Sequence, residues 1–362
     1  MDDVGAGTFA KPLLVELSHT VERFASAARA SGPVVLIAMF QKLAYFRREA
    51  DLYGDLAARG VVTVVGIVDP VPEGDGPDGM PAGVHHVALA GDLVKEWSVT
   101  ALGPGGGASL VAADLEALEP GAPTLEQGRT FRAGWSFRRD EARAQVERLC
   151  AKLNLRAAVR AEVDAVLGAV DAAPEPANQD AWDAVLHFLT ERFDAVERAR
   201  AETGAALSAV LDSTERDQHT GFHSHAFLDR WLAGSPDGTL PIGLVLLRLD
   251  GLSSLRADFG RRAELAVLKR LAQGLRQAVG GADRVIALGP EDFLVLLPSA
   301  GPADVLEACN AVSRIAGGLD EAYPFITLPA KVAGTVTRER PLPIARLRTH
   351  AGSGQDATLV PA

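Results

Sequence analysis

Two short apolar runs with a helical pattern between them constrain the fold of the first part of this chain most. Residues 33–40 read PVVLIAMF and residues 61–68 read VVTVVGIV, and both are rich in β-branched and other apolar side chains. Such runs are typical of strands buried on both faces. Residues 42–60 read as a helix that ends at Gly60, where a C-terminal cap glycine is expected. Because a strand–helix–strand unit pairs its strands in parallel through a right-handed crossover, we expect an α/β sheet here.

The rest of this segment predicts more strands and two flanking helices. A helical pattern covers residues 11–30, ahead of the first strand. Three further strands are predicted at residues 84–90, 96–103 and 108–115. Residues 131–155 predict a closing helix. Residues 1–155 are therefore expected to form an α/β sandwich of about five strands, a size ordinary for one sheet.

The acidic composition limits which partners are expected. The 362 residues include 47 Asp and Glu against 36 Lys and Arg, a formal net charge of −11 at pH 7. Broad nucleic-acid binding neutralises phosphates with Lys and Arg, so no nucleic-acid partner is expected. The longest apolar runs are far shorter than the roughly 20 residues of a membrane helix, so no membrane partner is expected. The two cysteines, Cys150 and Cys309, fit a reducing cytoplasm, and we expect a cytoplasmic protein.

The middle segment, residues 156–216, is predicted to be a helical linker. It is interrupted once, where Pro174 and Pro176 cannot lie inside a helix. Beyond this break, mostly apolar residues recur at spacings of three and four, which is typical of a coiled-coil seam. The seam positions are Leu186, Leu189, Phe193, Val196, Arg200, Thr203, Leu207 and Val210. We expect a parallel homodimer through residues 182–214, and the alternative is a helix packed on the core of its own domain.

The last segment, residues 217–362, predicts an α+β domain with a mostly antiparallel central sheet. A strand pattern at 240–250 is followed by a helical pattern at 257–280. Residues 284–298 read RVIALGPEDFLVLLP, two apolar runs around a tight acidic turn, which favours a hairpin. Another helix and one or two strands follow, at 304–319 and 325–337.

The last segment resembles the GGDEF domain of diguanylate cyclases, with four motifs in the order and at the spacing of that family. These residues are Asp217, Thr220 and Gly221, then Asp250, Phe259 and Gly260, then Asp283, and finally the signature Gly289, Pro290, Glu291, Asp292 and Phe293. The resemblance implies the GGDEF fold and a reaction that joins two GTP molecules into cyclic di-GMP. It also implies a divalent metal held by carboxylate oxygens. The family's lysine-bearing C-terminal helix has no clear counterpart after residue 340.

Departures from the family pattern predict that this domain is catalytically inactive. The resemblance places Arg248 where the family has its first metal-binding Asp, and a cation there repels metal. Arg256 and Leu265 stand at the two positions that read guanine in the family, and neither offers the same donors and acceptors. Pro290 lacks the N–H of the second signature glycine, and Gly280 stands where the product site has an Arg. The five signature residues are therefore interpreted as vestigial, with no catalytic residue and no metal site expected.

Two alternatives stay open for the same region. Four residues are candidates for holding a nucleotide, either GTP or cyclic di-GMP, without metal: Arg248, Asp250, Arg256 and Glu291. In the other alternative, Asp250 and Glu291 still hold metal, and the domain is a weakly active diguanylate cyclase. The simplest interpretation pairs the arginines with Glu291 and Asp292 or leaves them in solvent.

The first segment, over residues 30–155, resembles the DICT sensory domain, which is found in diguanylate cyclases and two-component proteins. The stretches that carry the resemblance are residues 46–69, 92–115 and 129–149. Six polar or amphipathic residues at the edges of predicted elements are candidates for a sensory pocket: Arg47, Arg48, Glu96, Trp97, Arg132 and Trp135. The alternative is that the Trp side chains fill the core and the Arg side chains pair with nearby acids.

Together these segments predict a signal-transduction protein. The DICT-like domain, residues 1–155, is joined by the linker, residues 156–216, to a degenerate GGDEF-like domain, residues 217–362. The last domain is expected to serve as a regulatory, dimerisation or nucleotide-binding module. A stimulus that favours one of two linker geometries would pass the signal to a downstream protein partner.

Overall fold

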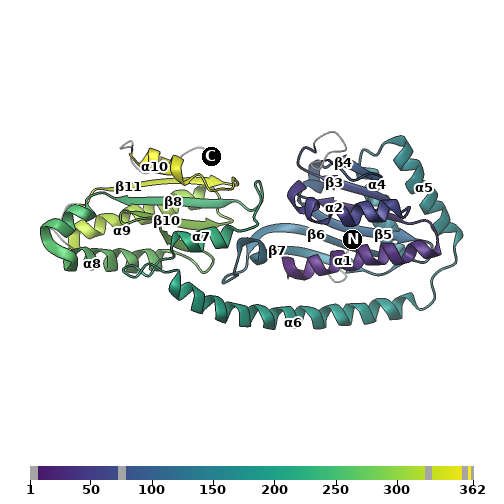
Figure 1. Cartoon of the computed structure of the whole chain (residues 1–362), viewed down its shortest axis with the longest axis horizontal. Helices are drawn as coiled ribbons and strands as arrows, with labels where there is room; N and C mark the ends of the chain where they lie inside the picture. Colours follow the sequence, from purple (N-terminus) through teal and green to yellow (C-terminus); the bar gives the residue numbers. More distant parts are fainter. Residues whose placement is uncertain (1–6, 72–78, 323–327, 353–357, 360–362) are drawn as a thin grey trace. The chain divides into compact units, whose positions relative to one another are not determined.

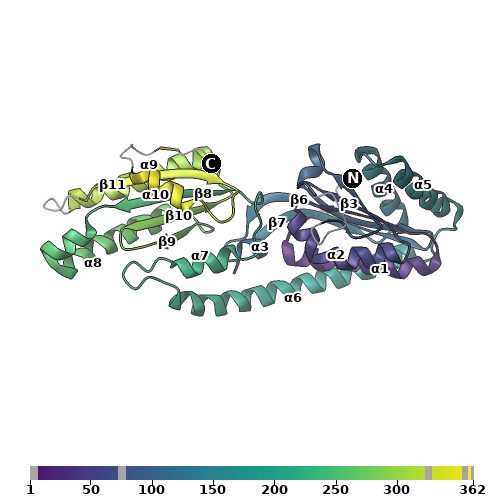
Figure 2. The ribbon, with the colours of Figure 1, turned by 45° about the horizontal axis from the view of Figure 1, so that its top comes forward.

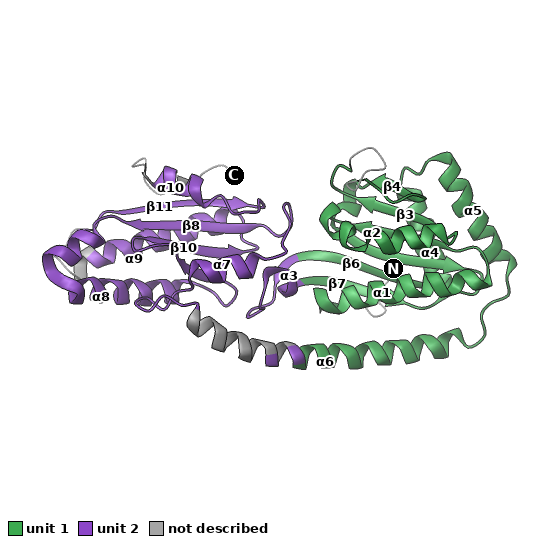
Figure 3. Cartoon of the chain, viewed as in Figure 1, with its two compact units in different colours: residues 1–115, 130–199 green, residues 116–129, 200–362 purple. Residues whose placement is uncertain are grey.

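The computed structural model describes residues 7–71, 79–322, 328–352 and 358–359, and the chain forms two compact units (Figure 3). The first unit comprises residues 1–115 and 130–199, and the second comprises residues 116–129 and 200–362. Each unit has a sheet of its own. None of the helices within the described ranges is long and apolar enough to cross a membrane.

The first unit contains a seven-stranded mixed sheet in the order β1-β7-β6-β5-β2-β3-β4 (Figure 1). Its strands are β1 (Gly7–Ala10), β2 (Val35–Phe40), β3 (Val62–Ile67), β4 (Val84–Ala88), β5 (Glu96–Gly103), β6 (Gly106–Leu118) and β7 (Arg129–Ser136). The expected parallel pairing of the two apolar runs is confirmed, because β2 and β3 pair in parallel with Val35 opposite Val62. The helix between them ends as expected, with Gly60 in the left-handed region at φ 81°.

The prediction of one helix over residues 131–155 was wrong, and so was the estimate of five strands. The first part of that segment is β7, which pairs with β1, and the helix α4 begins only at Arg139 (Arg139–Lys152). In β7 the side chains of Phe131 and Ala133 are buried, whereas that of Arg132 between them is exposed. This period of two belongs to a strand, and β1 and β7, which were not predicted, bring the sheet to seven strands.

Helices cover both faces of this sheet. Helices α1 (Lys11–Ala28) and α2 (Leu43–Ala58) lie side by side on one face, as Figures 1 and 2 both show. They bury one core with Leu36 of β2. Helices α4 and α5 (Ala157–Ala172) bury a second core with Val35 and Ile37, which point to the opposite face of β2. The long helix α6 (Gln179–Thr214) then runs from the first unit into residues assigned to the second.

The second unit confirms the predicted α+β domain with a mostly antiparallel sheet. The strand order is β12-β11-β8-β10-β9, and among these described strands only the β11–β12 pair is parallel. The strands are β8 (Ile242–Leu249), β9 (Arg284–Ala287), β10 (Asp292–Pro298), β11 (Ala330–Thr337) and β12 (Thr358–Leu359). Helices α8 (Leu252–Ala278) and α9 (Pro302–Ala322) bury one face of the sheet. The other face is covered by α7 (His225–Leu232), α10 (Ile344–Gly352) and the short α3 (Leu125–Gly128).

Candidate functional site

The signature hairpin is formed by β9 and β10, with Gly289 and Pro290 in the turn between them. β10 begins at Asp292 and pairs on its other side with β8, so that Asp292 lies opposite Arg248. Phe293, the next residue, is buried in the core of the second unit. The alternation of β10 therefore directs Phe293 and Asp292 to opposite faces of the sheet and fixes the signature beside the end of β8.

The Asp292 carboxylate accepts hydrogen bonds from two arginines. The Arg248 guanidinium donates two hydrogen bonds to the Asp292 carboxylate, from Nε at 2.8 Å and from Nη2 at 3.1 Å. Arg348 of α10 donates a third from its Nε at 2.9 Å. The Asp292 side chain is only 11% exposed, and its hydrogen bonds raise the pKa of Arg248. This carboxylate consequently ties α10 to the sheet, and α10 is the C-terminal helix that the sequence did not reveal.

The other two carboxylates of the region also have partners. Glu291 accepts hydrogen bonds from the backbone N–H and the hydroxyl of Ser253, at 3.2 and 3.0 Å. Ser253 lies in the first turn of α8, where a carboxylate is favoured by the helix dipole and by unpaired N–H groups. Asp250 forms an ion pair of 2.8 Å with Lys331 of β11. A metal bound by Asp250 and Glu291 would share these carboxylates with Lys331 and Ser253.

Arg256, the fourth candidate for nucleotide binding, pairs with a different group. Its guanidinium lies 3.8 Å from the carboxylate of Glu264, and its side chain is 60% exposed. Between the two residues, α8 is kinked at Gly260, whose φ of 79° lies in the region that favours glycine. This kink, one turn after Arg256, explains why the chain has a glycine at that position. The four candidates thus contact separate partners, and nucleotide binding by them stays a prediction.

A pocket of about 410 Å³ lies elsewhere in the second unit, and no signature residue lines it. Four arginines line it: Arg216, Arg230, Arg276 and Arg284. Arg230 is paired with Glu215, whereas Arg276 and Arg216 donate to the backbone carbonyls of Thr220 and Gly221. Asp283 also lines this pocket and accepts a hydrogen bond from the N–H of Gly280. The pocket is therefore rich in positive charge, although the chain is acidic.

The same pocket contains the buried imidazole of His223. It stacks on the Phe227 ring at a centroid distance of 3.8 Å, and it is 8% exposed. Its Nδ1 has no hydrogen-bond partner among the residues that the structure describes. Burial, assisted by Arg216, Arg284 and Arg230, lowers the pKa of His223 to about 4, so the ring is neutral near neutral pH.

The six candidates for a sensory pocket are distributed over both faces of the first sheet. Trp97 and Trp135 pack against the core under α1 and α2. Glu96 lies on the opposite face, where it accepts a hydrogen bond of 2.5 Å from Arg148 of α4. The other three are exposed, on α2 and on β7: Arg47, Arg48 and Arg132. Ligand binding by this set stays a prediction, and the packing of the two Trp side chains matches the alternative of a core role.

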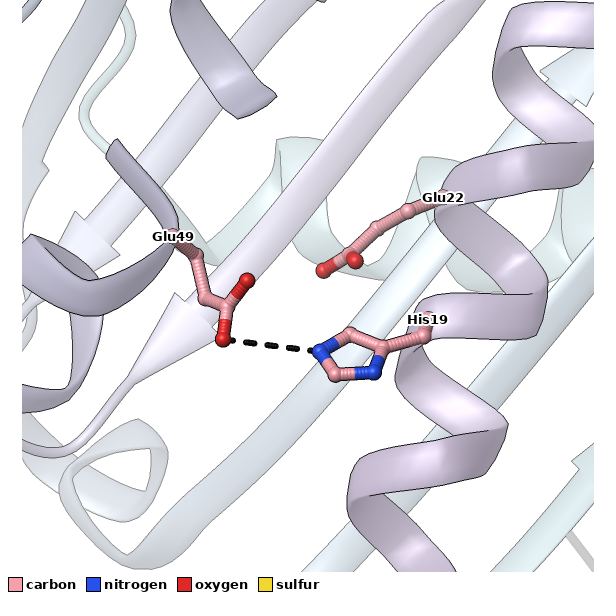
Figure 4. A group of neighbouring side chains, drawn as sticks. All are labelled: His19, Glu22 and Glu49. Carbon is pink, nitrogen blue, oxygen red and sulfur yellow. Dashed lines mark ion pairs between the residues drawn. The ribbon is translucent and has the colours of Figure 1, made fainter. Parts of the chain in front are cut away.

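A different group of polar side chains meets inside the first unit, between α1 and α2. His19 and Glu22 of α1 and Glu49 of α2 point toward one another (Figure 4). The His19 Nε2 lies 3.4 Å from a Glu49 oxygen, and Glu22 accepts a hydrogen bond of 2.6 Å from the Tyr53 hydroxyl. Sequence reasoning missed this group. The sequence does contain a signal for it. Glu22 follows His19 by three residues and falls on the apolar face of the helix predicted at 11–30, where a buried carboxylate is unusual.

Two family models match the chain, one in each unit. Residues 3–115 match the DICT model, described as a sensory domain in diguanylate cyclases and two-component systems. Residues 214–329 match the model of the GGDEF domain of diguanylate cyclases. A search of curated proteins found no match.

Solved structures similar to the chain include several GGDEF domains. The diguanylate cyclase SiaD of Pseudomonas aeruginosa, solved with its activator SiaC, is 17% identical with a TM-score of 0.37, and the match covers 62% of this chain and 88% of SiaD. The GGDEF domain of DgcB from Caulobacter crescentus, solved with cyclic di-GMP, is 13% identical with a TM-score of 0.33, covering 41% and 95%. The FimX GGDEF domain of P. aeruginosa is 19% identical with a TM-score of 0.32, covering 40% and 99%. The chain is a DICT–GGDEF signalling protein, with a DICT sensory domain followed by a GGDEF domain.

Proposed function

We propose that this DICT–GGDEF protein transmits a signal through a GGDEF domain that does not synthesise cyclic di-GMP. The observation that carries the proposal is the pairing of Arg248 with Asp292. At the position where the family has a metal-binding carboxylate, this chain has a guanidinium bonded at 2.8 Å to its own signature. A fixed cation there repels a divalent metal and takes the place of a ligand.

The neighbouring carboxylates support the same proposal. Glu291 is bonded to the first turn of α8, and Asp250 is bonded to Lys331. In metal-assisted phosphoryl transfer such carboxylates bind the ion, and here the Lys331 ammonium beside Asp250 would compete with it. In addition, Pro290 gives the signature turn no N–H at a position where a backbone donor could approach phosphate.

We further propose that α6 couples the two domains as a homodimer. Among the described side chains of α6, five exposed large apolar ones recur at spacings of three or four residues: Trp182, Val185, Leu189, Phe193 and Val196, at 65%, 48%, 55%, 38% and 59%. Phe188, at 59%, is also exposed but lies outside this stripe. Leu189, Phe193 and Val196 are predicted seam positions, whereas the predicted position Leu186 is half-buried. A second copy of the helix would bury the stripe. The seam positions Leu207 and Val210 have side chains outside the described residues. A downstream protein partner would sense the resulting dimer geometry.

The experiment that tests inactivity is incubation of the full chain with GTP and Mg²⁺ or Mn²⁺, followed by chromatography for cyclic di-GMP. The proposal expects no product with either metal. Product that is abolished by Glu291→Ala and retained by Glu307→Ala, an exposed glutamate on α9, would overturn it. That result would establish the alternative, a weakly active diguanylate cyclase that uses Asp250 and Glu291.

A second candidate function is a nucleotide receptor without chemistry, and the arginine-lined pocket favours it. Guanidinium groups bind phosphate in a bidentate geometry, and four of them line this pocket. The neutral imidazole of His223 lines it too and can accept or donate a hydrogen bond. Calorimetry with GTP and with cyclic di-GMP tests this function. Arg276→Gln should weaken binding at least tenfold, and Arg314→Gln, an exposed site on α9, should leave it unchanged. Absence of heat with both nucleotides would remove this candidate, and loss of binding only in Arg256→Ala would move the site to α8.

A further inference from the structure

His19, Glu22 and Glu49 form a group of side chains (Figure 4) whose ligand atoms are close enough together to hold a metal ion. One ligand atom of each side chain lies within 4.8 Å of the others. The His19 Nε2 and Glu49 Oε1 are 3.4 Å apart. In a tetrahedral shell with bonds of about 2.0–2.1 Å, two ligands are about 3.3 Å apart, so this pair already has the required separation.

The second observation is the state of the Glu22 carboxylate. The residue is 2% exposed, and its Oε1 accepts the hydrogen bond from Tyr53. Its Oε2 is buried and has no hydrogen-bond partner in the described part of the chain. Leaving a buried carboxylate oxygen without a partner is costly, and a cation at the centre of the group would satisfy it. We propose that His19, Glu22 and Glu49 bind a divalent first-row transition-metal ion of the Zn²⁺ type.

The donor set and its surroundings indicate this class of ion. One imidazole and two carboxylates suit Zn²⁺ and its neighbours, whereas Mg²⁺ and Ca²⁺ prefer oxygen ligands throughout. Tyr53 orients the Glu22 carboxylate from behind, as an outer partner of a metal ligand does. The side chains of His19 and Glu49 are 29% and 31% exposed, so an ion can enter and water can supply a fourth ligand.

The location gives the ion a structural consequence. His19 and Glu22 are three residues apart and share one face of α1, whereas Glu49 comes from α2. A bound ion would therefore crosslink the two helices that cover one face of the DICT sheet. Under the proposed function, the ion would be a stimulus or a stabiliser of the sensory domain. The binding site itself does not depend on whether the GGDEF domain is inactive.

Calorimetric titration of the full chain with Zn²⁺ at neutral pH, after removal of metal by a chelator, tests the site. We expect one saturable site, with affinity reduced at least tenfold by Glu22→Gln and by His19→Gln. His225→Gln and Glu141→Gln change exposed residues of the same types and should bind as the unchanged chain does. Circular dichroism and thermal unfolding establish that each variant is folded. Equal affinity in folded Glu22→Gln, or no saturable binding in the unchanged chain, would overturn the proposal.

Proton release gives a readout that a purely structural role would not change. The charged groups that face Glu22 are His19 and Arg23 of α1 and Glu49 of α2, together with the Tyr53 hydroxyl. A carboxyl group must lose its proton to bind a metal ion, so any proton that Glu22 carries is released when the ion binds. Titrations in buffers of different ionisation enthalpy should show this release, and Glu22→Gln should release fewer protons. Because cyclic di-GMP synthesis is assayed separately, failure of this site and failure of the proposed function are distinguishable.

Discussion

Arg248 and Asp292 face each other across β8 and β10, joined by two hydrogen bonds of 2.8 and 3.1 Å. Arg348 of α10 binds the same carboxylate at 2.9 Å. A signature carboxylate thus lies at the centre of a three-residue ion cluster that links a central strand, the hairpin and the C-terminal helix. In this domain Asp292 of the signature therefore makes contacts within the fold itself.

Removal of the Asp292 charge should therefore destabilise the second unit. Asp292→Asn leaves two guanidinium groups close together with a weaker acceptor. We expect the free energy of unfolding to fall by about 1.5–3 kcal/mol, the usual contribution of hydrogen bonds to charged groups. Urea denaturation measures it, with the exposed Asp258→Asn of α8 as the control. Equal losses in the two variants would contradict a specific role for the cluster.

A charge in the exposed apolar stripe of α6 should disrupt the proposed dimer. Leu189→Glu places a carboxylate in the seam, where burial against a second copy would desolvate it. Size-exclusion chromatography with light scattering should show a dimer for the unchanged chain and a monomer for this variant. Ala184→Glu adds the same charge on the opposite side of the helix and should remain dimeric. A monomeric unchanged chain would refute the seam.

Two glycines of the second unit should respond oppositely to alanine. A Cβ on Gly334 of β11 would lie 2.6 Å from the Cys309 Sγ and 2.8 Å from a Val305 methyl. Gly334→Ala should therefore destabilise the unit by about 1–3 kcal/mol through overpacking. Gly317 of α9 has open space around the same position, and Gly317→Ala should stabilise by up to about 1 kcal/mol through helix propensity. Thermal unfolding of the two variants shows whether each substitution raises or lowers the stability. A change in the same direction for both would contradict this packing.

Stability should depend on pH through Glu22. Burial raises the pKa of this carboxyl from 4.5 to about 7, so the folded chain keeps a proton that the unfolded chain has lost. The contribution of Glu22 to the free energy of unfolding is present in full below about pH 4.5. It is lost as pH rises to about 7, because in this range the unfolded state binds fewer protons than the folded state.

Glu22→Gln removes this titration and keeps a side chain of similar shape. At pH 8 the variant should be more stable than the unchanged chain by up to about 3 kcal/mol, and the difference should shrink toward pH 4. Urea denaturation over this pH range, with a chelator present, measures the difference. Parallel stability curves would show that Glu22 does not titrate as described.

Much of the fold could be predicted from local pattern. β2 and β3, and the hairpin of β9 and β10, are each formed by continuous apolar runs. Such a run predicts a buried strand without information from the rest of the chain. The GGDEF motifs are also local and keep their order, so the position of Arg248 beside the signature could be predicted from spacing. β7 was missed because its alternation runs without a break into the charged pattern of α4.

The sequence by itself determined the two kinds of domain and the order of most of their elements, and it placed Arg248 at the position that the GGDEF resemblance assigns to a metal-binding Asp. Only the tertiary structure decided which groups those residues contact. Lys331 reaches Asp250, and Arg348 reaches Asp292, from segments more than 50 residues away in the chain, because sheet pairing and helix packing bring them together. The meeting of His19 and Glu49 between α1 and α2 has the same cause. Such contacts depend on how whole helices lie on the sheet, which no local spacing encodes.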